Sequence, residues 1–86
     1  MDLEKEIEGK LVAKVEKEGG YCLKFVSPGH AGVPDRIVFL PGGHVKLIEV
    51  KRPNGKLSAL QKVWKRRFER LGLVWDCIGL EPTKRK

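Results

Sequence analysis

The feature that most constrains the fold is a proline- and glycine-rich turn between two apolar runs in the middle of the chain. Pro41, Gly42 and Gly43 separate residues 35–40 from residues 44–51, and both runs are rich in Val, Ile and Phe or Leu. Such runs predict β-strands, and a short Pro/Gly segment between them predicts a tight reversal. The centre of the chain is therefore expected to be a β-hairpin.

The segments on either side of this hairpin predict two helices and two more strands. Apolar residues recur at spacings of three and four over residues 2–18 and again over residues 57–71, as in amphipathic helices. Short β-prone runs occupy residues 21–26 and 73–78, and residues 81–86 are a polar, basic tail. The order αβββαβ predicts an α/β (α+β) fold, with one mixed sheet flanked by two helices.

The length of 86 residues predicts one small domain, spanning residues 1–86. It excludes large architectures for organic cofactors and favours a site built from a few side chains. No apolar run reaches the roughly 18 residues of a membrane helix, and the charged first residues are unlike a signal peptide. Cys22 and Cys77 stand alone, without histidines at zinc-ligand spacing, and are expected to be reduced thiols. We therefore expect an intracellular, cytoplasmic protein without a membrane partner.

The net charge of +7 is unevenly distributed along the chain. Residues 1–43 carry a charge of −1 and residues 44–86 a charge of +8. A basic field attracts phosphate backbones, which points to a nucleic acid partner; a merely solubilising surface is the alternative.

Acidic residues converge at one end of the predicted hairpin. Alternation along the second strand places Glu49 and Lys51 on one face, and Asp35 begins the first strand. Two carboxylates from neighbouring strands suit a hard divalent cation such as Mg²⁺, for which Mn²⁺ can substitute. A lysine beside them can orient water and offset charge on phosphorus.

This arrangement requires a particular hairpin register. A three-residue loop, residues 41–43, places Asp35 opposite Glu49, and a β-bulge would serve as well. A loop of two or four residues would place Asp35 opposite Val50, so that the two carboxylates would project from opposite faces.

Together, these residues resemble a known nuclease signature. Pro34-Asp35 followed by Glu49-Val50-Lys51 is similar to the PD-(D/E)xK pattern. Residues 32–38 (GVPDRIV) and residues 57–61 (LSALQ) resemble the VRR-NUC domain, the virus-type replication-repair nuclease, in its stand-alone phage-type form. The resemblance implies a restriction-endonuclease-like core and a Mg²⁺-dependent DNA endonuclease in replication, repair or recombination. It further implies Holliday-junction-like branched DNA as substrate and a homodimer.

The resemblance also implies roles for three further residues. The family's first-helix glutamate maps best onto Glu8, with Glu4 as the runner-up. Glu8 lies within the apolar arc of its helix, where a metal would satisfy its charge; a partly exposed Glu8 paired with lysine is the alternative. Gln61 would lie close to the catalytic residues Asp35, Glu49 and Lys51, or be an ordinary solvated polar residue. The carbonyl of Val50 would complete the metal shell.

Candidate DNA contacts flank the proposed metal site. The second helix carries basic residues that could follow phosphates, and polar residues surround the Asp35 turn; the expected contacts are Ser27, His30, Arg36, Arg52, Lys62, Lys65 and Arg66. Trp64 and Trp75 are expected in the core. The competing functions are a non-catalytic DNA-binding module, a nuclease subunit active only in a larger assembly, and an RNA-directed nuclease.

Overall fold

The computed structural model describes residues 3–79, and within this range every predicted element is present in the predicted order. The elements are α1 (Leu3–Lys17), β1 (Tyr21–Lys24), β2 (Arg36–Leu40), β3 (His44–Val50), α2 (Ala59–Arg70) and β4 (Val74–Ile78). The predicted basic tail, residues 81–86, lies outside the described residues. None of the helices described is long and apolar enough to cross a membrane.

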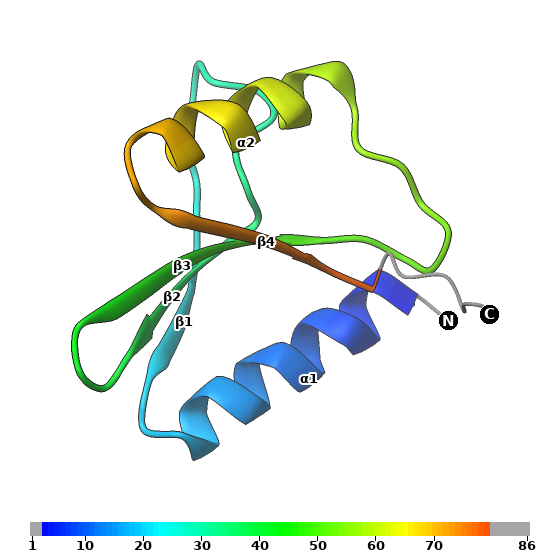
Figure 1. The fold of residues 1–86 in the computed structure, drawn as a ribbon. Helices are drawn as coiled ribbons and strands as arrows, with labels where there is room; N and C mark the ends of the chain where they lie inside the picture. Colours follow the sequence, from blue (N-terminus) through cyan, green and yellow to red (C-terminus); the bar gives the residue numbers. More distant parts are fainter. Residues whose placement is uncertain (1–2, 80–86) are drawn as a thin grey trace, which may run out of the picture.

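The strands form one mixed sheet in the order β1-β2-β3-β4. The pairs β1–β2 and β2–β3 are antiparallel, whereas β3 and β4 are parallel. A parallel pair needs a crossover connection, and α2 supplies it. Figure 1 shows α1 on one side of the sheet and α2 on the other, as the sequence predicts.

The hairpin has the register that the carboxylate site requires. Leu40 pairs with His44, so the loop is three residues long, and Arg36 pairs with Ile48. Both glycines of the loop have positive φ, 88° at Gly42 and 80° at Gly43, which explains why glycine occupies these positions. One further step along this register places residue 35 opposite residue 49.

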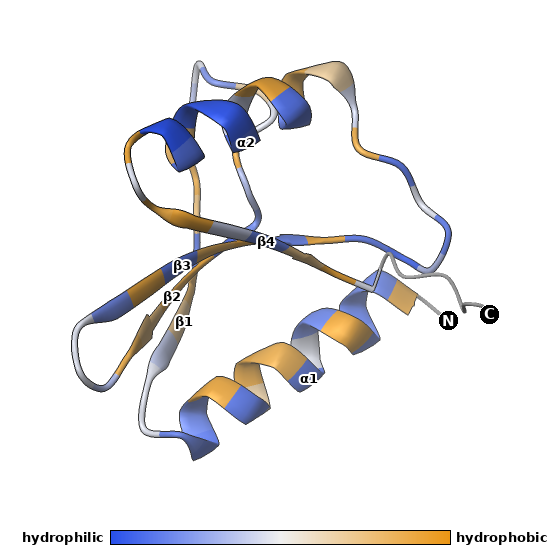
Figure 2. Ribbon diagram, in the orientation of Figure 1, coloured by the Kyte–Doolittle hydropathy of each residue, from blue (hydrophilic) through white to orange (hydrophobic). Residues whose placement is uncertain are grey.

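The buried core lies between α1 and one face of the sheet. Its fully buried members are Val15, Cys22, Val38, Ile48 and Val50. Figure 2 shows apolar residues along α1 and through the central strands, whereas the later turns of α2 are strongly hydrophilic. Burial raises the pKa of the Cys22 thiol above its ordinary value.

The second helix contributes less to the core than its apolar spacing predicts. No residue of α2 is fully buried, and Leu60 is 51% exposed. Trp64 and Trp75 are half-buried, so their expected place in the core is wrong. The indole N–H of Trp64 donates to the carbonyl of Ala31 at 3.0 Å, so this ring anchors the loop before β2.

Candidate active site

The central residue of the site is Glu49, a carboxylate buried on the α2 face of β3. Only 2% of the residue is exposed. Its Oε2 accepts a hydrogen bond from Nε2 of Gln61 at 3.0 Å, whereas its Oε1 is buried without a hydrogen-bond partner. Buried polar atoms without partners are rare and costly, so this oxygen is a candidate ligand atom.

Asp35 lies beside Glu49 and is held by the backbone of β3. Its Oδ2 accepts a hydrogen bond from the Val50 N–H at 2.8 Å. Its own carbonyl accepts from the Phe25 N–H at 2.9 Å, which ties the residue to the chain leaving β1. The Asp35 side chain thus replaces a strand carbonyl at the end of the β2–β3 ladder. This contact fixes one carboxylate oxygen.

The electrostatics of the pair raise the pKa of Glu49 to about 8, from an ordinary value of 4.5. Burial is the main cause, and the neighbouring Asp35 carboxylate is the next. Lys51 opposes the shift, whereas the more distant charge of Glu4 adds to it. Without a cation, Glu49 therefore holds a proton at neutral pH.

The residues present fit a hard divalent cation. Within residues 3–79 no three His, Cys, Asp or Glu side chains are grouped closely enough to form an all-protein metal cage. Mg²⁺ does not need such a cage, because it is usually held by one or two carboxylates, with water and substrate phosphate as the other ligands. The unpartnered Oε1 of Glu49, close to Asp35, is the kind of donor that such an ion requires.

Of the two helix acids considered from the sequence, Glu8 has a different partner. Its Oε2 accepts a hydrogen bond from Nε of Arg36 at 2.6 Å, and both side chains are largely buried. Arg36 also donates to the carbonyl of Cys22 at 3.2 Å. Glu8 therefore lies in an ion pair on the α1 face, and the charge that reaches Glu49 from α1 is that of Glu4.

This ion pair gives Arg36 a structural role in addition to the one expected from the sequence. Its side chain is only 14% exposed and is held by two protein acceptors, and its contact with DNA stays a prediction. No local sequence pattern indicates the pair, because its two members are 28 positions apart.

Several of the other candidate DNA contacts lie around α2. The Ser27 hydroxyl lies 3.1 Å from Nδ1 of His30, and the His30 ring meets the Trp64 ring edge-on at 5.6 Å. The ammonium of Lys65 is bound by Glu69 at 3.0 Å and lies 5.4 Å from the centre of the Trp75 ring. Three other basic candidates are exposed: Arg52, Lys62 and Arg66.

Ser58 is a residue of the site that the sequence reading missed. Its hydroxyl accepts from the Gln61 N–H at 3.1 Å, and its own N–H donates to Oε1 of Gln61 at 2.8 Å, forming a capping box at the start of α2. The spacing Ser-x-x-Gln is the known signature of this cap and could have revealed it.

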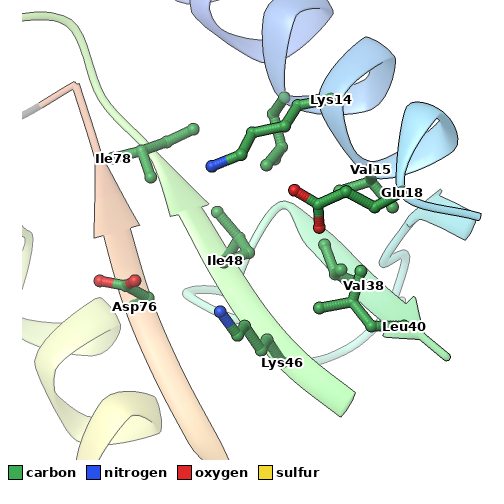
Figure 3. A pocket seen from close by; sticks show the side chains of 10 residues that line it. Lys14, Val15, Glu18, Val38, Leu40, Lys46, Ile48, Asp76 and Ile78 are labelled. Atoms are coloured by element: carbon green, nitrogen blue, oxygen red, sulfur yellow. The ribbon is translucent and has the colours of Figure 1, made fainter. Parts of the chain in front are cut away.

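A small pocket lies on the opposite face of the sheet, between α1 and strands β2, β3 and β4. Figure 3 shows its apolar floor, which includes Val38 and Ile48, and a rim that includes Lys14 and Asp76. Neither Asp35 nor Glu49 lines this pocket. It is therefore separate from the carboxylate site.

Comparison with known proteins assigns the chain to a family. The profile of the VRR-NUC domain matches residues 3–75, a range that includes both carboxylates and Gln61. The chain belongs to the VRR-NUC family. A solved structure described as a VRR-NUC domain superposes with a TM-score of 0.87 at 28% identity, over 93% of this chain and 87% of that one. The mixed sheet with two helices is thus the VRR-NUC fold.

A phage protein is similar at the sequence level. The "Putative nuclease p44" of Acyrthosiphon pisum secondary endosymbiont phage 1 is 50% identical over 58 residues. The matched part is 67% of this VRR-NUC chain and 62% of the phage protein, so it spans less than two thirds of that relative.

Proposed function

We propose that this VRR-NUC chain is a Mg²⁺-dependent DNA endonuclease whose metal is held by Asp35 and Glu49. The observation that carries the proposal is the unpartnered, buried Oε1 of Glu49 beside an Asp35 that the Val50 N–H holds in place. A buried acid with an unpartnered oxygen would be a costly arrangement for a structural site. The family and the phage relative's name support nuclease chemistry.

Each side chain of the site has a separate role in the proposed hydrolysis of a phosphodiester bond. Bound Mg²⁺ would supply a Lewis acid for the phosphate and lower the pKa of water. Asp35 and Glu49 would hold the cation, with the Val50 carbonyl as a further ligand and Glu4 as the helix acid of the site. Lys51, whose charge already acts on Glu49, orients the attacking water and offsets charge on the phosphate. The water oxygen bonds to phosphorus as the P–O bond to the leaving oxygen breaks, and the proton lost by the water is balanced by one taken up by the leaving oxygen.

The exposed basic residues support DNA as the substrate. Arg52, Lys62 and Arg66 are available to phosphates, and Ser27 and His30 form a polar loop packed against α2. Branched DNA as the substrate follows from the resemblance to stand-alone phage-type members and is part of the proposal.

A nuclease assay with matched variants tests this proposal. Purified protein is incubated with duplex, single-stranded, flap and four-way-junction DNA and with single-stranded RNA, with and without Mg²⁺ or Mn²⁺. We expect metal-dependent cleavage, most rapid on the junction, and a loss of at least about 100-fold in Asp35→Asn and Lys51→Ala. Asp76→Asn, an exposed acid on the other face, is the control and should remain active.

The competing functions predict different outcomes. Binding of DNA without cleavage, equal in wild type and Asp35→Asn, would indicate a non-catalytic DNA-binding module. Mn²⁺ binding without cleavage would indicate a subunit that requires a larger assembly. Cleavage of RNA in preference to every DNA substrate would overturn the choice of nucleic acid.

We further propose that two copies associate through the α2 face of the sheet near the hairpin turn. Tyr21, Phe39 and Val45 are register partners across three strands, and they are exposed by 68%, 39% and 36%. This row is uncharged, so it suits a second copy of the chain better than DNA. An isologous contact would pair the same row from each copy and leave both carboxylate sites accessible at the other end of the sheet.

A further inference from the structure

The side chain of Gln61 connects the N-terminal cap of α2 to the carboxylate of Glu49. Its Oε1 accepts from the Ser58 N–H at 2.8 Å, which caps α2, and its Nε2 donates to Oε2 of Glu49 at 3.0 Å. The two partners require opposite properties, because Ser58 offers a donor and Glu49 an acceptor. The amide can satisfy both in only one orientation, so the helix cap fixes which end of Gln61 faces Glu49.

This contact selects one carboxylate oxygen of Glu49. Oε2 is occupied by the amide, and Oε1 has no hydrogen-bond partner. A carboxylate that could rotate freely would present either oxygen, whereas a bound one presents a fixed oxygen. Groups that hydrogen-bond to a metal ligand in this way typically change metal affinity by about 10- to 100-fold when they are removed.

The hydrogen bond between Gln61 and Glu49 also links α2 to the sheet. No residue of α2 is fully buried, and half-buried aromatic residues seat the helix, such as Phe68, which packs on Phe25. In the described part of the chain, the Gln61–Glu49 bond is a direct polar link between its first turn and the central strand. A shift of the cap would therefore move the amide against Glu49.

We propose that Gln61 is a positioning residue that holds Glu49 with Oε1 presented to the cation, so that metal affinity depends on the capped start of α2. This inference rests on the proposed function and deepens it. Gln61 does not touch the reacting atoms. Its effect is on the occupancy of the site by the cation.

Variants in the cap distinguish the effect of Gln61 on Glu49 from its effect on the stability of α2. Gln61→Met keeps the length of the side chain but removes both bonds, whereas Ser58→Ala removes only the hydroxyl part of the cap and leaves the Ser58 N–H and Glu49 contacts of Gln61. Both variants lose part of the cap, which is typically worth about 1 kcal/mol. Only Gln61→Met loses the contact with Glu49.

The readout is the affinity of the DNA-free protein for Mn²⁺, measured by electron paramagnetic resonance or calorimetry. We expect Gln61→Met to raise the Kd for Mn²⁺ by about tenfold or more, and Ser58→Ala to change it by less than about twofold. In cleavage assays the Gln61→Met defect should be largely recovered at high Mg²⁺, because only occupancy is impaired. Equal Mn²⁺ affinity in wild type and Gln61→Met, or equal loss in both variants, would overturn the inference.

A measurement on the wild type covers the case in which Gln61→Met does not fold. The side-chain NH₂ resonances of Gln61 should shift when Mg²⁺ is added, together with the backbone resonance of Glu49. If the Glu49 resonance shifts and those of Gln61 do not, the positioning role is wrong although the nuclease proposal stands. If wild type binds no Mn²⁺ and Asp35→Asn changes nothing, both proposals fail.

Discussion

At the scale of single residues, the buried side-chain polar atoms of the site have hydrogen-bond partners, with one exception. Asp35 is bound by the Val50 N–H, and Gln61 is bound at both ends of its amide. Oε1 of Glu49 alone among buried side-chain N and O atoms in residues 3–79 has no hydrogen-bond partner. The residue-level chemistry therefore centres on a buried acid that is unfavourable as an anion until a cation reaches it.

The raised pKa of Glu49 predicts a pH-dependent stability of the metal-free protein. Its pKa is about 8 in the folded protein and 4.5 ordinarily, so the folded state holds the proton more tightly. The contribution of Glu49 to the free energy of unfolding is fully present well below pH 4.5 and is lost as the pH rises to about 8. This contribution is on the order of a few kcal/mol.

Urea unfolding at pH 5, 6.5 and 8.5 in a chelator measures this effect. Glu49→Gln should remove most of the decline, whereas Glu6→Gln, on the exposed surface of α1, should retain it. A decline of equal size in wild type and Glu49→Gln would contradict the assigned cause.

The Glu8–Arg36 ion pair predicts that the two acids of α1 have different functions. Glu8→Gln should lower the free energy of unfolding by about 1–3 kcal/mol, because Arg36 loses its charged acceptor in a largely buried setting. Its Mn²⁺ affinity should stay unchanged. Glu4→Gln should weaken Mn²⁺ binding, since the charge of Glu4 reaches Glu49. Weakened Mn²⁺ binding in folded Glu8→Gln instead would restore Glu8 as the helix acid.

At the scale of elements, the position of α2 depends on the loop that precedes β2. The loop meets the helix through the Trp64 N–H, which donates to Ala31, and through the close approach of Gly32 to Leu60. A Cβ on Gly32 would lie 2.7 Å from the Cβ of Leu60 and 2.8 Å from its backbone carbon. The loop and the helix therefore act as one unit beside the carboxylates.

This contact predicts different effects for alanine at two glycines of similar conformation. Gly32 has φ +93° and Gly43 has φ +80°, but nothing lies within 4 Å of a Cβ on Gly43. Gly43→Ala should cost about 1–2 kcal/mol of backbone strain. Gly32→Ala should cost about 1–3 kcal/mol more, because α2 must also move. Thermal unfolding followed by circular dichroism measures both, and equal losses would show that the loop does not support the helix.

Neighbouring cations on α2 should contribute unequally to DNA binding. Arg66 is exposed, whereas the ammonium of Lys65 already has Glu69 as a counter-ion at 3.0 Å. Arg66→Ala should reduce the slope of log K against log salt by about 1, and Lys65→Ala by clearly less. Fluorescence anisotropy with labelled junction DNA in Ca²⁺, at several salt concentrations, measures these slopes. A larger change for Lys65→Ala would mean that its bond to Glu69 opens on DNA.

At the scale of the whole molecule, the two faces of the sheet have different roles, since one holds the buried core and the other the candidate site. Figure 1 shows α1 and α2 on opposite sides of the sheet. The face covered by α1 holds the buried core, and the face covered by α2 holds the carboxylates at one end and an exposed apolar row at the other. Parallel pairing of β3 with β4 brings the C-terminal part of the described chain back to Glu49, because Cys77 is its register partner.

The exposed row predicts how the oligomeric state can be changed. Tyr21→Lys should convert the proposed dimer to a monomer with little change in thermal stability, because this side chain is 68% exposed and outside the buried core. Leu71→Lys, at a residue 74% exposed beyond the end of α2, is the control and should remain dimeric. Light scattering after gel filtration reports the mass. A monomeric wild type, or a dimeric Tyr21→Lys, would remove this surface as the interface.

The sequence by itself determined the elements, their order and the place of Asp35 and Glu49 near one end of the hairpin. Periodicity and turn chemistry are local properties, so they specify helices, strands and the position of the turn, whereas the structure decided that the hairpin loop has three residues. The hairpin register then follows from the loop length, and with it the face on which each carboxylate lies.

Only the tertiary structure decided the partners of these residues. Glu8 is bound to Arg36 rather than placed beside Glu49, and Gln61 links the cap of α2 to the carboxylate. Trp64 is half-buried because it supports a loop rather than the core. Such contacts join residues that are distant in sequence, and they depend on how each helix is seated on its face of the sheet. Local patterning leaves that seating open, and packing decides it.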